Sequence, residues 1–128
     1  MTEQKVFNGA ELEQALAEYA VELGGVESKI RNPKNEYKTL RVFKAATKGA
    51  AEGAAEGRIF LIIHEGSDPL VIDFFIPTEL QQKMIEQYET ASASQLIDKK
   101  RAVQLVLTDQ FDLLDLKSFI LQSLNRVD

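Results

Sequence analysis

The segment RIFLIIHEGSDPLVIDFFI, from Arg58 to Ile76, decides the fold that this sequence predicts. Two apolar runs flank the turn-forming residues 66–69, and this arrangement predicts a β-hairpin. Both runs are apolar at successive positions rather than at alternating ones, which is typical of strands that are covered on both faces. The hairpin is therefore expected in the middle of a sheet.

The hairpin carries the single histidine of the chain, His64, and an acid, Asp73, among apolar residues. A four-residue turn places Ile62 opposite Asp73 and puts His64 diagonally across from Asp73 on the same face. The two residues are the candidate catalytic pair of a small hydrolase or metal-dependent enzyme. We favour a structural pair, because no nucleophile, second histidine or further acid stands at a spacing that completes a catalytic or metal set.

The residues before the hairpin predict a helix, a connection and a strand. Asn8 can cap a helix whose apolar stripe runs from Leu12 to Leu23, where two glycines end it. A polar connection follows, and the run from Tyr37 to Ala46 predicts a strand whose lysines suit the edge of a sheet. Residues 47–57 are expected to form a mobile loop, since they contain the Gly-Ala-Ala-Glu repeat of residues 49–57.

The residues after the hairpin predict two further helices and one strand. Thr78 can cap a helix that ends in the Ala-Ser-rich run of residues 90–94. Residues 101–108 alternate apolar and polar side chains and predict a strand, and Asp112 can cap a last helix that continues to Val127.

The expected order is therefore α-β-β-β-α-β-α. It indicates an α+β fold with a mostly antiparallel sheet of about four strands and helices packed largely on one face, in a single domain spanning residues 1–128.

At the level of topology this order resembles two groups of proteins. One is the nuclease family with a Pro-Asp motif followed by Asp/Glu-x-Lys, in which Asp73 stands at the Asp/Glu position and Phe75 occupies the lysine position. That resemblance implies a nucleic-acid-associated protein with a nuclease-like fold but an incomplete catalytic set. The other is the secretion-chaperone fold of small acidic dimers, from which the expected order departs by one strand after the second helix.

Composition bounds the class of protein. The 128 residues are 45% hydrophobic and 27% charged with a net charge of −5, which describes a small acidic globular protein. Cysteine is absent, so disulfides and thiolate metal sites are excluded. No apolar run reaches the length of a membrane span and the first residues are too polar for a signal peptide, so we expect a cytoplasmic protein without membrane contact.

The charge is distributed unevenly. Residues 26–48 hold seven basic and two acidic side chains, whereas the remainder holds eight basic and 18 acidic ones. A basic segment on an acidic body can bind an anionic partner such as nucleic acid. Solvated charges on an edge strand explain the segment better, because a nucleic-acid domain is usually basic overall. The possible anion-binding residues are Lys29, Arg31, Lys34, Lys38, Arg41 and Lys44.

The last helix is apolar over more than half of its circumference. Beside its main stripe, Leu114 and Leu121 lie on one shoulder and Phe119 on the other. Such a helix is either enclosed between two layers or shared with a partner. We favour a partner and expect self-association through Leu114, Leu121 and Phe119.

These observations favour a non-catalytic protein–protein interaction module, either an adaptor or a chaperone-like protein, that forms a homodimer and binds another protein. No cofactor or metal is expected. The alternatives are the nucleic-acid-associated protein and the enzyme built on His64 and Asp73.

Overall fold

The structure, a computed structural model, describes residues 9–33, 35–45, 59–67, 69–94, 96, 101–107 and 112–125. The elements of this part of the chain are α1 (Gly9–Glu22), β1 (Gly25–Asn32), β2 (Asn35–Ala45), β3 (Ile59–His64), β4 (Val71–Phe75), α2 (Thr78–Gln87), β5 (Ala91–Ala93), β6 (Ala102–Val106) and α3 (Leu113–Leu124). The mobile loop expected at residues 47–57 lies outside the described residues, as do Asn8 and Val127.

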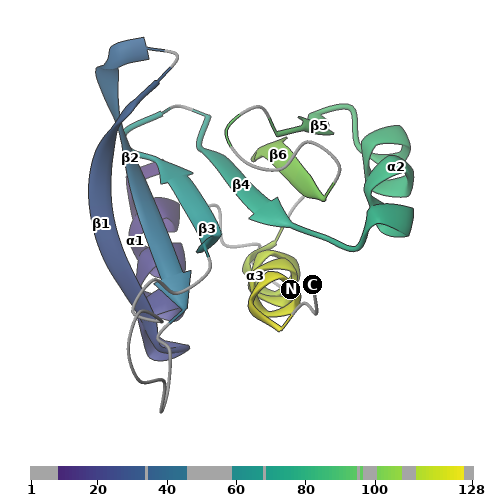
Figure 1. Cartoon of the computed structure of the whole chain (residues 1–128), viewed down its shortest axis with the longest axis horizontal. Helices are drawn as coiled ribbons and strands as arrows, with labels where there is room; N and C mark the ends of the chain where they lie inside the picture. Colours follow the sequence, from purple (N-terminus) through teal and green to yellow (C-terminus); the bar gives the residue numbers. More distant parts are fainter. Residues whose placement is uncertain are drawn as a thin grey trace, which may run out of the picture.

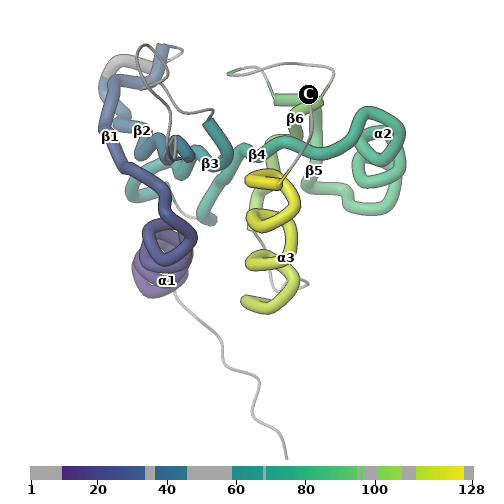
Figure 2. The backbone as a smooth tube through the Cα atoms, turned by 60° about the horizontal axis from the view of Figure 1, so that its bottom comes forward, coloured from purple at the N-terminus to yellow at the C-terminus, as the bar shows by residue number. Residues whose placement is uncertain are grey.

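The described strands form one six-stranded antiparallel sheet in the order β1-β2-β3-β4-β6-β5. Figures 1 and 2 show α1 and α3 side by side on one face of this sheet, while α2 lies at its β5 end. The expected α+β class and antiparallel sheet are therefore confirmed. Among the described helices, none is long and apolar enough to cross a lipid bilayer.

The central hairpin has the predicted position and register. β3 and β4 are the two middle strands, and eight of their eleven residues are buried. Ile62 pairs with Asp73 and Ile63 with Ile72, as the four-residue turn requires. Continuous apolar runs therefore identified strands that are covered on both faces.

The expected strand count and element order were wrong. Two strands were missed: β1 lies in the segment interpreted as a polar connection, and β5 lies in the run interpreted as the frayed end of a helix. β2 is consequently an inner strand between β1 and β3, and its lysines do not mark an edge. The observed order, α-β-β-β-β-α-β-β-α, replaces the one on which both topological resemblances rested.

The main core lies between the sheet and the helices. α1 contributes Leu16, Ala17 and Ala20, and α3 contributes Leu116 and Ile120. From the strands come Phe43, Leu61, Ile63, Ile72, Phe74, Val103 and Leu105, which point to the same face. On the opposite face a smaller buried cluster consists of Leu40, Val42 and Ile62, with Ile59 and Leu96 packed against it.

The sheet opens between β3 and β4, and α3 fills the opening. The two strands pair only at the two positions named above. Beyond them, Ser123 Oγ accepts a hydrogen bond from the Phe75 amide at 2.9 Å and donates one to the Phe60 carbonyl at 2.7 Å. A hydroxyl from α3 thus bridges a buried amide of β4 and a buried carbonyl of β3.

The helix starts agree only in part with the predictions. Asp112 caps α3 as predicted, because its Oδ1 accepts a hydrogen bond from the Asp115 amide at 2.8 Å. Thr78 does not cap α2, since Pro77 occupies the cap position and no side chain bonds there. Three residues after Thr78, the Gln81 side chain donates to the Ala102 carbonyl of β6 at 2.8 Å.

Candidate functional site

Asp73 is the buried polar centre of the sheet. It lies on β4, on the face away from α1 and α3, and is inaccessible to solvent. Its Oδ1 lies 2.7 Å from His64 Nε2, and its Oδ2 accepts hydrogen bonds from Ser94 Oγ at 2.6 Å and Gln104 Nε2 at 3.4 Å. A buried carboxylate is costly without partners, and three donors from three different strands or strand ends satisfy this one.

The predicted contact between His64 and Asp73 is present. Asp73 also accepts hydrogen bonds from Ser94 and Gln104, so the pair belongs to a larger hydrogen-bond network. Carboxylate oxygens accept hydrogen bonds, so we place a proton on Nε2 of the imidazole. Ser94 Oγ donates to Asp73 Oδ2, and Ser67 Oγ donates to the backbone carbonyl of His64. The described groups therefore orient His64 without placing a nucleophile against it.

Metal binding finds no support in the described residues, where no group of three or more His, Cys, Asp or Glu side chains is arranged to hold an ion.

Sequence reasoning found His64 and Asp73 but missed Ser94 and Gln104. Gln104 lies on β6, which pairs with β4, and is directly opposite Asp73 in the ladder, whereas Ser94 follows β5, the strand beyond β6. The alternation of Gln104 with apolar neighbours was visible in the sequence, but the partner strand was not.

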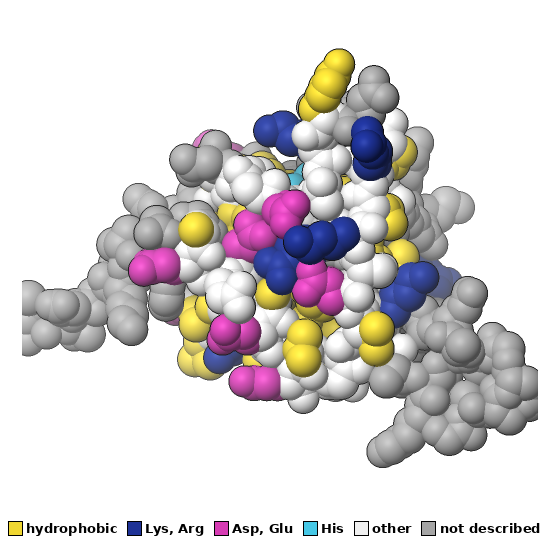
Figure 3. Space-filling model, turned by 90° about the vertical axis from the view of Figure 1, so that its left-hand side faces the viewer, with side chains coloured by type: hydrophobic (Ala, Val, Ile, Leu, Met, Phe, Trp, Pro, Cys, Tyr) yellow, Lys and Arg dark blue, Asp and Glu magenta, His cyan; other side chains and the backbone are white. Residues whose placement is uncertain are grey.

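Two of the six candidate anion-binding residues, Lys29 and Arg41, are paired with acids. Arg41 lies between two carboxylates: its Nε is 2.6 Å from Glu27 on β1, and its Nη1 is 2.9 Å from Glu13 on α1. Lys29 Nζ is 2.9 Å from Glu65. Figure 3 shows acidic and basic side chains gathered over the β1 side of the molecule. Arg31 and Lys38 are exposed, Lys44 is half-buried, and Lys34 lies outside the described residues.

The Arg41 cluster connects three elements and shifts the ionisation of its members. The hydrogen bonds from Arg41 lower the pKa of Glu27, and those carboxylates raise the pKa of the Arg41 guanidinium. Glu13 also accepts a hydrogen bond from the Gly66 amide at 3.0 Å, so it links α1 to the turn after β3. These contacts tie α1, β1 and the central hairpin together.

A groove of about 380 Å³ runs beside this cluster, between α1 and β1. Its charged lining consists of Glu18, Glu22, Glu27 and Arg41. The acids outnumber the guanidinium, which already binds two carboxylates. This groove does not suit an anionic ligand.

The expected partner-binding residues of α3 separate into two groups. Phe119 packs against the main core and stacks on Phe74, with ring centroids 5.4 Å apart. Leu114 and Leu121 are exposed, at 75% and 39%. They are seven residues apart, so they lie along one side of the helix two turns from each other. We call these two residues the α3 ridge.

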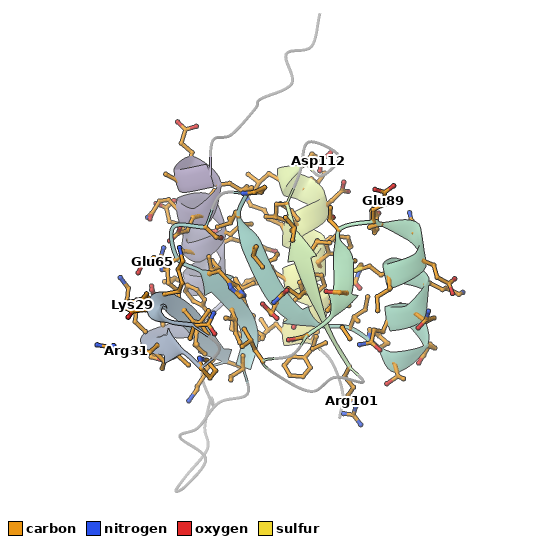
Figure 4. The ribbon with its side chains drawn as sticks, turned by 90° about the horizontal axis from the view of Figure 1, so that it is seen from above. Lys29, Arg31, Glu65, Glu89, Arg101 and Asp112 are labelled. Carbon is orange, nitrogen blue, oxygen red and sulfur yellow. The ribbon has the colours of Figure 1, made fainter. Side chains whose placement is uncertain are left out.

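Charged side chains lie at both ends of the sheet. Figure 4 shows Lys29, Arg31 and Glu65 together on the β1 side, and Glu89 and Arg101 on the side of α2 and β6. The ion pair between Lys29 and Glu65 belongs to the first group. Charges are thus present on both sides of the sheet.

Comparison of the sequence with protein-family models and with curated proteins gives no significant match. Among solved structures, the chain is similar to the crystal structure of the Deinococcus radiodurans protein DR2400, with the family-model domain DUF419. The similarity has a TM-score of 0.69 at 17% sequence identity and covers 87% of this chain and 74% of the other. At this identity the likeness establishes the fold alone.

Proposed function

We propose that this protein is a non-catalytic interaction module that binds another protein through the α3 ridge. The observation that carries the proposal is the exposure of Leu114 and Leu121 on a helix whose opposite side is fixed in the core by Leu116 and Ile120. Single exposed leucines are common, but two in line on a rigid helix match the anchor spacing by which helices enter hydrophobic grooves.

The chemistry of the ridge favours a grooved partner. Ser118 lies between the two leucines and is small enough to let another surface approach, while Lys117 turns away to lie over the Tyr19 ring at 5.1 Å. The inward packing of Phe119 narrows the apolar arc expected from the sequence. Two leucines alone cover little of the roughly 1,200–2,000 Å² that a stable interface buries. A partner that encloses them in a groove can supply the remaining contact.

The test is a comparison of partner binding by two double variants. Leu114→Glu with Leu121→Glu should remove binding while keeping the wild-type melting temperature, because both positions are exposed. Gln87→Glu with Ser92→Glu adds the same charge at exposed positions elsewhere and should bind as wild type does. The readout is cross-linking and recovery of bound protein from the native host, followed by binding measurements with the purified partner. Equal binding by wild type and the ridge variant would rule the proposal out.

A further inference from the structure

The outer edge of β1 is a long strand edge in the described sheet. β1 has eight residues and is the terminal strand, so no described strand pairs on its outer side. Figure 3 views the molecule from this side. The opposite edge, β5, has three residues and contacts α2. An exposed edge of this length offers a row of backbone donors and acceptors to another strand.

The ladder fixes which residues offer those groups. The Glu65 amide donates to the Thr39 carbonyl, so Thr39 directs its backbone groups toward β3. Because direction alternates along a strand, Leu40 and Val42 face β1 and bond to their partners Ile30 and Ser28. The outward-facing backbone groups of β1 therefore belong to Glu27, Lys29 and Arg31.

This alternation restricts how two copies of β1 can pair in an antiparallel, two-fold symmetric manner. With Ser28 on the axis, Glu27 meets Lys29 of the partner subunit twice, and Val26 meets Ile30 of the partner subunit twice. An axis at Glu27 brings two carboxylates together, and an axis at Lys29 brings two ammonium groups together. An axis at Ile30 sets Lys29 against Arg31 of the partner subunit. Only the Ser28 register pairs opposite charges without a like-charged pair.

The surroundings of β1 suit the same register. Charges on an edge strand usually protect it from pairing, and two of the three on β1 are matched within the chain, Lys29 by Glu65 and Glu27 by Arg41. The third, Arg31, is exposed and would lie opposite Gly25 of the partner subunit in this register. Val26 and Ile30 are 62% and 49% exposed and lie on the same face. Pairing in the Ser28 register would cover each with the other.

We propose that the chain self-associates by antiparallel pairing of β1 with β1 of a second copy, with Ser28 on the two-fold axis. The result is one sheet that continues through both copies. Self-association then belongs to β1 rather than to α3, which leaves the α3 ridge open to a different protein. This inference does not depend on the function proposed for that ridge.

The absence of cysteine from the chain provides a direct test. In the Ser28 register the two Ser28 Cα atoms form a non-hydrogen-bonded pair about 4.5 Å apart, a separation that a disulfide spans. Ser28→Cys should therefore give a disulfide-linked dimer under mild oxidation. Ile30→Cys is the matched control, since its two copies would be offset by four residues, about 13 Å, and should stay unlinked.

A second variant tests the backbone bonds. Lys29→Pro removes an outward N–H and leaves the bonds between β1 and β2 intact. Wild type should be a dimer by light scattering at about 100 µM, and this variant a monomer. A monomeric wild type, or equal cross-linking of Ser28→Cys and Ile30→Cys, would overturn the proposal. So would a dimer that survives Lys29→Pro but is lost on Leu114→Glu with Leu121→Glu, which would assign self-association to α3.

Discussion

Asp73 draws hydrogen bonds from His64, Ser94 and Gln104 while it is fully buried. Asp73→Ala should lower the free energy of unfolding by about 1–3 kcal/mol, because it removes the acceptor to which the buried Ser94 hydroxyl donates. Asp73→Asn should cost less, since the amide oxygen can still accept from Ser94. Chemical denaturation of the two variants measures the difference.

The same network provides a test of the enzymatic alternative. His64→Gln keeps a side-chain donor near Asp73 and should leave partner binding and melting temperature close to wild type. A structural role for the pair requires that function and stability fall together. If His64→Gln or Asp73→Asn abolished activity in the host while the melting temperature stayed unchanged, the structural role would be contradicted and a catalytic site favoured.

Arg41 is 14% exposed and bonded to carboxylates of two other elements. Arg41→Met should destabilise the protein by about 2–3 kcal/mol, since Glu13 and Glu27 lose a shared cation. The exposed Arg31→Met is the control and should be near neutral. Thermal or urea unfolding at neutral pH distinguishes the two.

The Arg41 cluster also predicts a pH dependence. Arg41 lowers the pKa of Glu27 below its ordinary value of 4.5. The interaction therefore stabilises the folded state fully above about pH 4.5. Its contribution to the free energy of unfolding is lost as the pH falls through the lowered pKa of Glu27 in the folded state. Urea unfolding from pH 6 to pH 3 should show the stability gap between wild type and Arg41→Met narrowing. A constant gap would show that Glu27 is not held by Arg41.

The sequence predicted the contact between residues of one hairpin but not the contacts between elements that are far apart along the chain. His64 and Asp73 belong to one hairpin, so the turn length alone determined that they meet. Ser94 and Gln104 approach Asp73 only because β5 and β6 join the sheet beyond β4. Arg41 and Glu13 belong to elements that are separated along the chain, and nothing in the spacing indicated their contact.

At the scale of elements, Ser123 is the point where α3 holds the two halves of the sheet together. Ser123→Ala should destabilise the fold by about 2–3 kcal/mol, because the Phe75 amide and the Phe60 carbonyl lose a buried partner. Ser118→Ala on the exposed side of α3 is the control and should change stability little. Hydrogen exchange should show faster exchange of the Phe75 amide in Ser123→Ala, and an unchanged rate would contradict the bridging role.

The elements that the sequence predicted are those with strong apolar patterns of their own. β2, β3, β4, β6 and the three helices were predicted from such patterns, and all appear in the structure. β1 is a mostly exposed strand of mixed polarity, and β5 has three residues. Both depend on backbone pairing with a neighbouring strand, which single-segment patterns do not report. The edge of the sheet was misplaced for this reason.

At the scale of the whole molecule, the net charge of −5 opposes binding to nucleic acid. The structure adds that Arg41 and Lys29 are paired with carboxylates, so part of the basic segment is neutralised. We therefore expect no salt-sensitive binding to DNA or RNA tighter than about 10 µM at physiological salt. Fluorescence anisotropy over a salt series measures the affinity for labelled DNA or RNA and its dependence on salt. Lys34→Glu with Lys38→Glu and Lys44→Glu tests the segment, and Lys83→Glu on α2 is the control. Tight binding that weakens steeply with salt, and that only the triple variant abolishes, would promote the nucleic-acid alternative, because phosphate contacts by those lysines would then outweigh the repulsion from the acidic body.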